Sequence, residues 1–397
     1  MLNGHAYYFV GANFWQGMEL GVQGAKGDRK LLDEELDHLQ NLGVTNLRIM
    51  ASSEGPNTEP HRVIPALMPS PGLYDQKVLD GLDFLLSEMG KRSIKAVMIL
   101  NNFWYWSGGM AQYVSWQEGT PIPRIGDWNT FMNYSAKFYS CGQCQGWYRN
   151  YIKMMIDHVN GYNGLPYHDD PTIFSWELAN EPRRYPDGWI DDTAAYIKAL
   201  DPNHLVTTGS EGSPSGEMID FNKTHDGSNI DYATIHIWPQ NWGWYDPKSV
   251  STYDGAVGKS INYFQKYEAD AALLGKPLVL EEFGLARDWE PIHDIYNTVS
   301  ATTYRDRFYT SMYSEVYDSI LKGGPVAGDN FWAWAGQSRP GDNWIGDPPH
   351  EPAGWYSVYY IDRSTLAIIA SHVQQIIRTQ VQNFSMGFPS DGFGHGN

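Results

Sequence analysis

The stretch Ile94-Lys-Ala-Val-Met-Ile-Leu100 is an almost unbroken apolar run, and the polar residues Asn101 and Asn102 follow it at once. An apolar run of this length without alternation is typical of a parallel strand buried on both faces of a sheet. Seven further short apolar runs occur along the chain. The expected strands are Tyr7–Ala12, Asn46–Met50, Ile94–Leu100, Ile173–Glu177, His204–Thr208, Ala233–Ile237, Leu278–Glu282 and Asn330–Trp334.

Helical periodicity fills many of the segments between these strands. Leu31, Leu32, Leu36 and Leu39 fall on one stripe of Lys30–Leu42, which is the pattern of an amphipathic helix. Other helices are expected at Val78–Met89, Phe131–Tyr139, Trp147–Asn160, Trp189–Leu200, Ser260–Leu274 and Tyr304–Leu321, and long connections at Ala51–Lys77, Asn101–Asp127, Pro239–Val250 and Ala335–Ser357.

Eight strands that alternate with helices predict the fold class. It is an α/β fold, a (β/α)8 TIM barrel with enlarged βα loops, formed by residues 1–378 as a single domain. Residues 379–397 are rich in Gly, Ser and Asn and predict a loosely ordered C-terminal tail. A doubly wound open sheet is the alternative, although no G-x-G-x-x-G motif follows any expected strand.

The charge and the composition narrow the class of ligand. With 28 basic and 46 acidic residues, the net charge of −18 disfavours nucleic acid and anionic membrane surfaces as partners. No run of about 18 apolar residues exists, so no membrane-spanning helix is expected. The 16 Trp outnumber the 15 Phe, while only 19% of the residues are charged. We expect about half of the aromatic rings in the core and the rest to favour flat, neutral, hydroxylated ligands such as sugars.

The cysteines and the start of the chain bear on cofactors and compartment. Cys141 and Cys144 are the only cysteines, and no His pair lies near them to complete a zinc site. This arrangement favours a small local disulfide or inert thiols over redox catalysis. The start Met1–His5 has neither a basic nor an apolar signal region. We therefore expect the mature chain of an extracellular protein, or alternatively a cytoplasmic protein, and a monomer without metal or cofactor.

Polar and aromatic side chains gather where the expected strands end. The carboxyl ends of barrel strands meet at one rim, and the chemistry of such barrels takes place there. Chance would seldom place carboxylates, amides, His, Arg and Trp at six strand ends of one barrel. These residues are Arg48, Asn101, Asn102, Trp104, Glu177, Asn180, Glu181, Arg183, His236, Trp238, Glu281, Glu282 and Trp332.

Carboxylates at the ends of the fourth and seventh strands are what cleavage of a glycosidic bond requires. One carboxyl group protonates the leaving oxygen, and the other attacks the anomeric carbon or activates water. Their pKa values must be pushed apart, and Arg48 and His236 are candidates for that tuning. The alternative is a pair of buried, ion-paired glutamates that only stabilise the rim.

Each of these strands offers two carboxylates. Glu281 and Glu282 are adjacent, and successive side chains of a strand point to opposite faces, so only one of them is expected to enter the site. The spacing does not choose between them. We interpret Glu177, four positions before Glu181, as structural.

The segments Trp176-Glu-Leu-Ala-Asn-Glu-Pro182 and Leu280-Glu-Glu-Phe-Gly284 carry a resemblance to a known family. With Arg48, His236 and Trp332 in matching order, the chain resembles glycoside hydrolase family 5 and, within it, the endo-β-1,4-mannanases. The resemblance runs over about residues 5–375 and implies a retaining (β/α)8 hydrolase.

This resemblance also implies roles for individual residues. The general acid/base falls on Glu181 and the nucleophile on Glu282, which leaves Glu281 to meet the helix layer or a loop arginine. The other implied roles are 2-hydroxyl binding by Asn180, support of the nucleophile by Arg48, a sugar site lined by His236 and Trp332, a subsite tryptophan at Trp104 and a leaving-group-side arginine at Arg183.

One position departs from the family pattern. Most members have His-x-Tyr on the sixth strand, whereas this chain has His236-Ile-Trp238. An indole N–H donates a hydrogen bond but accepts none, so Trp238 is expected to keep only the donor role toward the nucleophile.

The sequence therefore predicts retaining hydrolysis of β-1,4-mannosidic bonds in mannan, glucomannan or galactomannan. Three alternatives stay open: an exo-acting β-mannosidase, a β-1,4-glucanase on the same barrel, and a sugar-binding barrel without catalysis.

Overall fold

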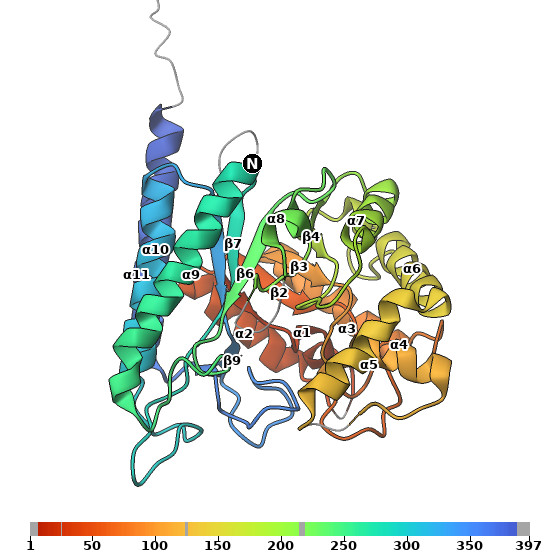
Figure 1. The fold of residues 1–397 in the computed structure, drawn as a ribbon, viewed down its shortest axis with the longest axis horizontal. Helices are drawn as coiled ribbons and strands as arrows, with labels where there is room; N and C mark the ends of the chain where they lie inside the picture. Colours follow the sequence, from red (N-terminus) through yellow and green to blue (C-terminus); the bar gives the residue numbers. More distant parts are fainter. Residues whose placement is uncertain (1–6, 25, 124–125, 214–218, 387–397) are drawn as a thin grey trace, which may run out of the picture.

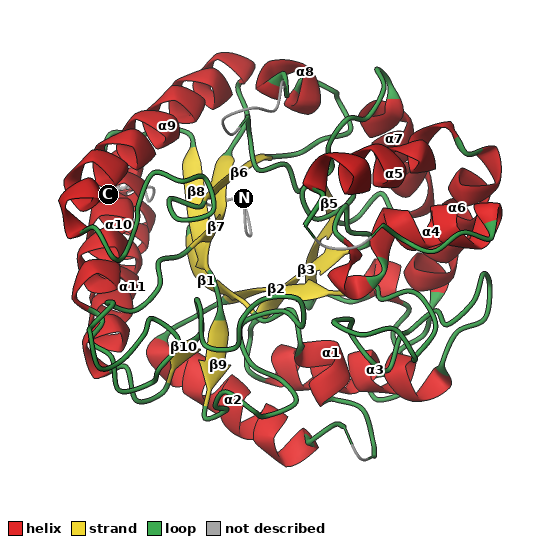
Figure 2. Cartoon of the chain, turned by 60° about the horizontal axis from the view of Figure 1, so that its bottom comes forward, coloured by secondary structure: helices red, strands yellow, loops and turns green. Residues whose placement is uncertain are grey.

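The structure is a computed structural model that describes residues 7–24, 26–123, 126–213 and 219–386. Eight parallel strands follow the order β5-β4-β3-β2-β1-β8-β7-β6, and Figure 2 shows them as a ring with helices outside. Between β5 and β6, the Asp231 N–H donates to the Val206 carbonyl (2.9 Å). The strands are β1 (Phe9–Asn13), β2 (Asn46–Met50), β3 (Lys95–Ile99), β4 (Ile173–Glu177), β5 (Leu205–Thr207), β6 (Ala233–Ile237), β7 (Leu278–Phe283) and β8 (Val326–Phe331). The (β/α)8 barrel is confirmed.

The helices cover the outside of the sheet (Figure 1). In α2, the side chain of Asp28 accepts from the Leu31 N–H at the first turn, and Gly43 ends the helix with a φ of +88°. Between these caps, the apolar stripe faces inward. The helices are α1 (Gly17–Leu20), α2 (Arg29–Leu42), α3 (Gln76–Lys91), α4 (Gly109–Glu118), α5 (Trp128–Ser140), α6 (Gly142–Asp157), α7 (Trp189–Leu200), α8 (Phe221–His225), α9 (Tyr253–Leu274), α10 (Thr303–Leu321) and α11 (Arg363–Met386), with 3-10 turns η1 (Tyr105–Ser107), η2 (Tyr167–Asp169) and η3 (Val250–Thr252).

The eighth strand lies four residues earlier than the predicted Asn330–Trp334. The strand Val326-Ala-Gly-Asp-Asn-Phe331 carries two polar side chains, which hide it from a search for apolar runs. Both are buried with partners: Asp329 pairs with His372 (2.9 Å), and Asn330 donates to Asn46 (2.9 Å). The short strand β9 (Trp334–Gly336) instead pairs with β10 (Val358–Tyr359) in a separate sheet.

Four of the described helices were not expected, namely α1, α4, α8 and α11. α4 lies inside the predicted connection Asn101–Asp127, and α11 continues past the predicted domain boundary at residue 379. Thr379 is buried, and the Gln380 side chain donates to the Tyr8 carbonyl, so this turn of α11 packs against the barrel. Residues 387–397 of the predicted tail lie outside the described residues. None of the described helices has the length and apolar character needed to span a membrane.

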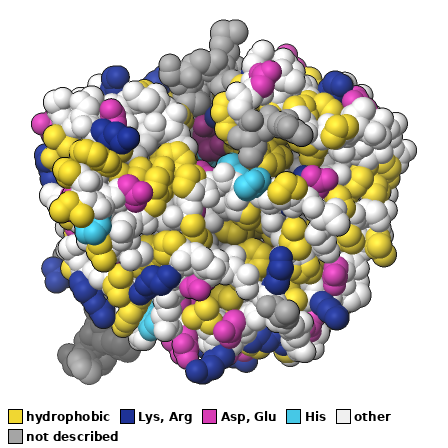
Figure 3. Space-filling view, turned by 90° about the horizontal axis from the view of Figure 1, so that it is seen from below, with side chains coloured by type: hydrophobic (Ala, Val, Ile, Leu, Met, Phe, Trp, Pro, Cys, Tyr) yellow, Lys and Arg dark blue, Asp and Glu magenta, His cyan; other side chains and the backbone are white. Residues whose placement is uncertain are grey.

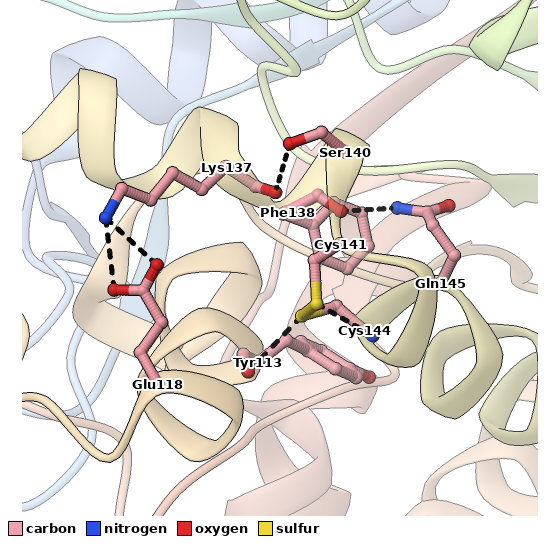
Figure 4. The surroundings of a disulfide bond; sticks show 8 residues. All are labelled: Tyr113, Glu118, Lys137, Phe138, Ser140, Cys141, Cys144 and Gln145. Atoms are coloured by element: carbon pink, nitrogen blue, oxygen red, sulfur yellow. Dashed lines mark hydrogen bonds and ion pairs between the residues drawn. A yellow bond between two sulfur atoms is a disulfide. The ribbon is translucent and has the colours of Figure 1, made fainter.

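Cys141 and Cys144 form a disulfide between the end of α5 and the first turn of α6, as Figure 4 shows. Cys141 is the N-cap of α6, and its sulfur accepts from the Cys144 N–H (3.0 Å). The Cys144 sulfur is buried against the Tyr113 carbonyl of α4 (3.5 Å). The bond therefore confirms the prediction of a small local disulfide.

We predict that the double variant Cys141→Ser, Cys144→Ser folds with little loss of stability. The bridge closes a loop with a sequence separation of only 3, so the chain-entropy contribution is about 2 kcal/mol or less. Urea unfolding measures this difference, with the reduced parent as the control. A loss well above 3 kcal/mol would contradict a purely local role for the bridge.

Candidate active site

Arg48, the middle residue of β2, lies in the centre of the barrel with no exposed surface. Its Nε and Nη2 donate to the two carboxylate oxygens of Glu177 (2.8 and 2.6 Å), and its Nη1 donates to Glu282. The Asn13 and Asn180 side-chain oxygens also accept from the guanidinium (3.0 and 2.8 Å). A planar group with donors in a fixed fork thus sets the positions of carboxylates from β4 and β7.

Glu282 lines the cleft and Glu281 does not, but both side chains point into the barrel interior, so the expectation that they face opposite sides of the strand is wrong. The register of β7 shifts at this point: Leu280 pairs with Ile235, and Glu282 pairs with the next residue, His236. Such a bulge interrupts the alternation of side chains. Glu281 therefore does not meet the helix layer; its Oε2 lies 3.5 Å from His236 Nε2 and 3.7 Å from Arg48 Nε.

Glu181 follows β4 and approaches Glu282 from the other side of the barrel. Its φ of +49° is uncommon for a residue with a side chain, and its N–H donates to the Gly209 carbonyl (2.9 Å). Oε1 accepts from His236 Nδ1 (2.8 Å), and Oε2 accepts from Trp104 Nε1 (2.6 Å). One oxygen of Glu181 and one of Glu282 lie within 4.8 Å of each other. That is close to the separation of about 5–5.5 Å in retaining glycosidases and below the roughly 6.5–9.5 Å of inverting ones.

The charges around His236 and Glu181 set where the proton of this pair resides. Burial alone would raise the pKa of Glu181, but the hydrogen bond and charge of His236, with Arg183 and Trp104, lower it to about 2. Burial would lower the pKa of His236, but the Glu282 charge and the bonds to Glu181 and Glu281 raise it to about 10. In the unliganded site the shared proton therefore lies on the imidazole.

The pKa of Glu282 is shifted in the direction opposite to that of Glu181. Burial raises its pKa, and the charges of His236 and Arg48 only partly offset this effect. The Trp238 indole donates to Oε2 (3.1 Å), which is the donor contact expected for this position. With Arg48 on Oε1, both oxygens of Glu282 are held by donors.

Arg183 and Asn180 are held by partners in this region. Arg183 donates to Glu211 (2.6 Å from Nε), and its guanidinium lies 4.8 Å from the Trp104 ring centre. Asn180 donates to Asn102 (3.1 Å) and accepts from Arg48. Glu211, which lies just beyond the expected strand His204–Thr208, was missed because the sequence does not show that it pairs with Arg183.

These side chains lie at the bottom of a cleft of about 670 Å³ at the carboxyl ends of the strands. Figure 3 looks onto this face, where hydrophobic side chains gather around the hollowed centre. Of the residues to which the resemblance gave a role, all line the cleft except the fully buried Arg48 and His236. The other residues named at the expected strand ends, Asn101, Asn102, Glu177 and Glu281, are buried and do not line it. The lining residues are Trp104, Trp106, Trp128, Asn180, Glu181, Arg183, Glu211, Trp238, Gln240, Asn241, Trp242, Glu282, Trp332, Pro348, His350, Glu351, Pro352 and Trp355.

Two features of the lining went beyond the sequence analysis. Seven of the 16 Trp line the cleft, but none of the lining residues is Tyr or Phe, so the share of aromatic rings that faces the ligand site is much smaller than the expected half. His350, Glu351 and Trp355 come from the long connection after β9, whose course the sequence did not show. Within the described ranges, the group of side chains spaced to share a metal ion is Glu181, His236 and Glu282, and in this group His236 Nδ1 already contacts both carboxylates.

A model of the family described as GH family 5 beta-mannosidase-like matches residues 1–381. The chain belongs to glycoside hydrolase family 5. It is 32% identical to mannan endo-1,4-beta-mannosidase 1 of Oryza sativa subsp. japonica, over 84% of this chain and 76% of that one. This member is thus a relative of enzymes that hydrolyse glycosides.

Solved structures of family members are also similar. A family 5 mannosidase from Rhizomucor miehei has a TM-score of 0.91 and 38% identity, covering 96% of this chain and 95% of that one. A glutamate-to-alanine variant of that mannosidase, solved in complex with mannosyl-fructose, gives the same score and identity over 95% of both chains. An endo-1,4-beta-D-mannanase from Thermotoga petrophila has a TM-score of 0.72 and 26% identity, covering 93% and 99%.

We predict that Arg48→Met destabilises the protein by about 3–5 kcal/mol, because it leaves buried carboxylates without their cation. The matched control is Arg307→Met, which breaks an ion pair with Asp254 whose side chains are 55% and 89% exposed and should cost about 1 kcal/mol or less. Urea unfolding measures both. Equal losses in the two variants would contradict the central role of Arg48.

Proposed function

We propose that this family 5 glycoside hydrolase is a retaining enzyme that cleaves β-1,4-mannosidic bonds in mannan, glucomannan or galactomannan. The observation that carries the proposal is the pair Glu181 and Glu282, with oxygens within 4.8 Å, at the bottom of a tryptophan-lined cleft. The names of the relatives, mannan endo-1,4-beta-mannosidase and family 5 mannosidase, support mannose as the sugar.

In the first step, Glu282 is the nucleophile. A carboxylate oxygen forms a bond to the anomeric carbon while the bond from that carbon to the leaving oxygen breaks, and Glu181 gives this oxygen a proton. Arg48 and Trp238 donate to Glu282. They hold the carboxylate in the orientation for attack.

In the second step, Glu181 is the base. It takes a proton from a water molecule, whose oxygen attacks the anomeric carbon and releases Glu282. The charge of Glu282 is absent from the mannosyl-enzyme, so Glu181 no longer faces a second carboxylate. Since His236 Nδ1 lies 2.8 Å from Glu181, the imidazole and the carboxyl act as one proton-holding pair through both steps.

The remaining predicted residues bind substrate in this proposal. Trp332 and Trp104 offer ring faces and edges in the cleft for the C–H faces of sugars. Arg48 donates to both Asn180 and Glu282, so the Asn180 side chain is held near the nucleophile. From this position its amide binds the 2-hydroxyl of the sugar. Arg183 lies over the Trp104 ring on the side of Glu181, where the leaving sugar departs.

We also infer that the protein acts outside the cell, as a monomer. Mannan is a polymer too large to enter cells, and the Cys141–Cys144 disulfide is a bond that persists in oxidising compartments.

An exo-acting β-mannosidase is the second candidate, and one feature of the cleft favours it. The long connection after β9 contributes His350, Glu351 and Trp355 to the wall, and the His350 ring lies parallel to that of Trp106 at 6.2 Å. A wall at one end would admit only the end of a sugar chain.

For the nucleophile, we predict that Glu282→Ala lowers kcat on mannan by about 10³-fold or more, because no covalent intermediate forms. Glu118→Ala, an exposed position outside the cleft, is the control and should match the parent. Reducing-sugar release from mannan, glucomannan and carboxymethylcellulose gives the measurement. Parent-like hydrolysis by Glu282→Ala would refute the assignment, and activity on carboxymethylcellulose alone would favour a glucanase.

The first products from mannohexaose separate endo from exo action. Endo action cuts inside the chain and yields mannobiose, mannotriose and mannotetraose, which is the result that we expect for the proposed function. Mannose and mannopentaose as the first products would replace endo action by exo action. Chromatography of early time points makes the distinction.

A further inference from the structure

We propose that Glu281 is a positioning residue of this site, which holds the His236 ring so that its Nδ1–H points at both catalytic carboxylates. The inference deepens the proposed function and rests on it for the roles of Glu181 and Glu282. The placement of Glu281 itself follows from the bulge in β7.

Glu281 is held firmly in the barrel interior. Its side chain is only 1% exposed, and its backbone carbonyl accepts from the Asn13 side chain (2.9 Å). Oε2 faces His236 Nε2 at 3.5 Å and Arg48 Nε at 3.7 Å. The carboxylate therefore lies between the two cations that support the nucleophile.

His236 connects Glu281 to the reacting groups. From one fully buried ring, Nε2 faces Glu281, while Nδ1 lies 2.8 Å from Glu181 Oε1 and 3.3 Å from Glu282 Oε2. A carboxylate at Nε2 favours a hydrogen on that nitrogen and fixes the plane of the ring. With carboxylates at both nitrogens, the ring is held as an imidazolium that donates from each side.

The other charged groups around the ring do not replace Glu281. Glu181 and Glu282 both lie at Nδ1, so neither fixes Nε2. Glu177 faces the cluster from β4, but Arg48 occupies both of its oxygens. Glu211 from beyond β5 is bonded to Arg183. In the described part of the chain, Glu281 is the carboxylate in contact with Nε2.

The first test is the titration of His236, observed by nitrogen-15 NMR of its ring in the unliganded protein. Glu281→Gln keeps the shape and removes the charge, so we expect the pKa of His236, about 10 in the parent, to fall by about one unit or more. Glu281→Asp keeps the charge and should restore most of the shift. Glu177→Gln is the matched control: it removes one buried carboxylate that contacts Arg48 and Glu281 but not the His236 ring, and its shift should be clearly smaller.

The second test is kinetic. The pair Glu181–His236 must hold its proton for the acid step, so its loss at high pH limits the reaction. In Glu281→Gln, we expect kcat on mannohexaose to fall about 10–100-fold with KM nearly unchanged. The alkaline limb of the kcat profile should move to lower pH, and Glu281→Asp should recover both.

Two results would overturn the role of Glu281. One is a parent-like His236 titration in both Glu281 variants, and the other is an equal shift in Glu177→Gln, which would make the effect one of total charge. The NMR titration needs no substrate. A parent protein that hydrolyses no manno-oligosaccharide would refute the proposed function, while the titration would still decide whether Glu281 controls the ring.

Discussion

The site depends on one buried cation surrounded by carboxylates. Arg48 has no exposed surface and binds Glu177, Glu282 and two asparagine side chains with its five donors. An uncompensated charge in this interior would cost several kcal/mol, so the carboxylates and the arginine require each other. The barrel supplies the geometry, because β2, β4 and β7 deliver these side chains to one point from opposite sides of the ring. The position of the proposed nucleophile at the rim therefore depends on the buried ionic cluster around Arg48.

That cluster also explains how two glutamates in one cleft acquire different tasks. Glu282 belongs to the ionic cluster, since Arg48 and Trp238 donate hydrogen bonds to its two oxygens. Glu181 has no hydrogen bond to Arg48 among those described and instead accepts from His236 and Trp104. The imidazole reaches both carboxylates and therefore couples their protonation. In a buried group of coupled residues, the titration belongs to Glu181, Glu282 and His236 together. In our proposal, Glu281 influences which of them carries the proton, because it faces the other nitrogen of His236.

The sequence was sufficient for the strands that are apolar and for the residues that end them. β2, β4, β6 and α7 have the predicted bounds, and Glu181 and Glu282 meet as the strand ends implied. The sequence was not sufficient for β8, where polar residues are buried. Asp329 and Asn330 lie in the interior because they pair with His372 and Asn46, which are distant in the sequence. The rule of alternation failed at Glu281, because a bulge is a property of paired strands and leaves no mark in a single one. Glu211 was missed for a similar reason, since only the folded chain brings it to Arg183.

The most direct measurement of the central claim is the configuration of the first sugar released. Proton NMR of a fresh digest of mannohexaose resolves the α and β anomers before they interconvert. Two displacements at one carbon, first by Glu282 and then by water, preserve the configuration, so the initial product should be the β anomer. An initial α anomer would mean a single displacement by water, and the nucleophilic role of Glu282 would then be wrong.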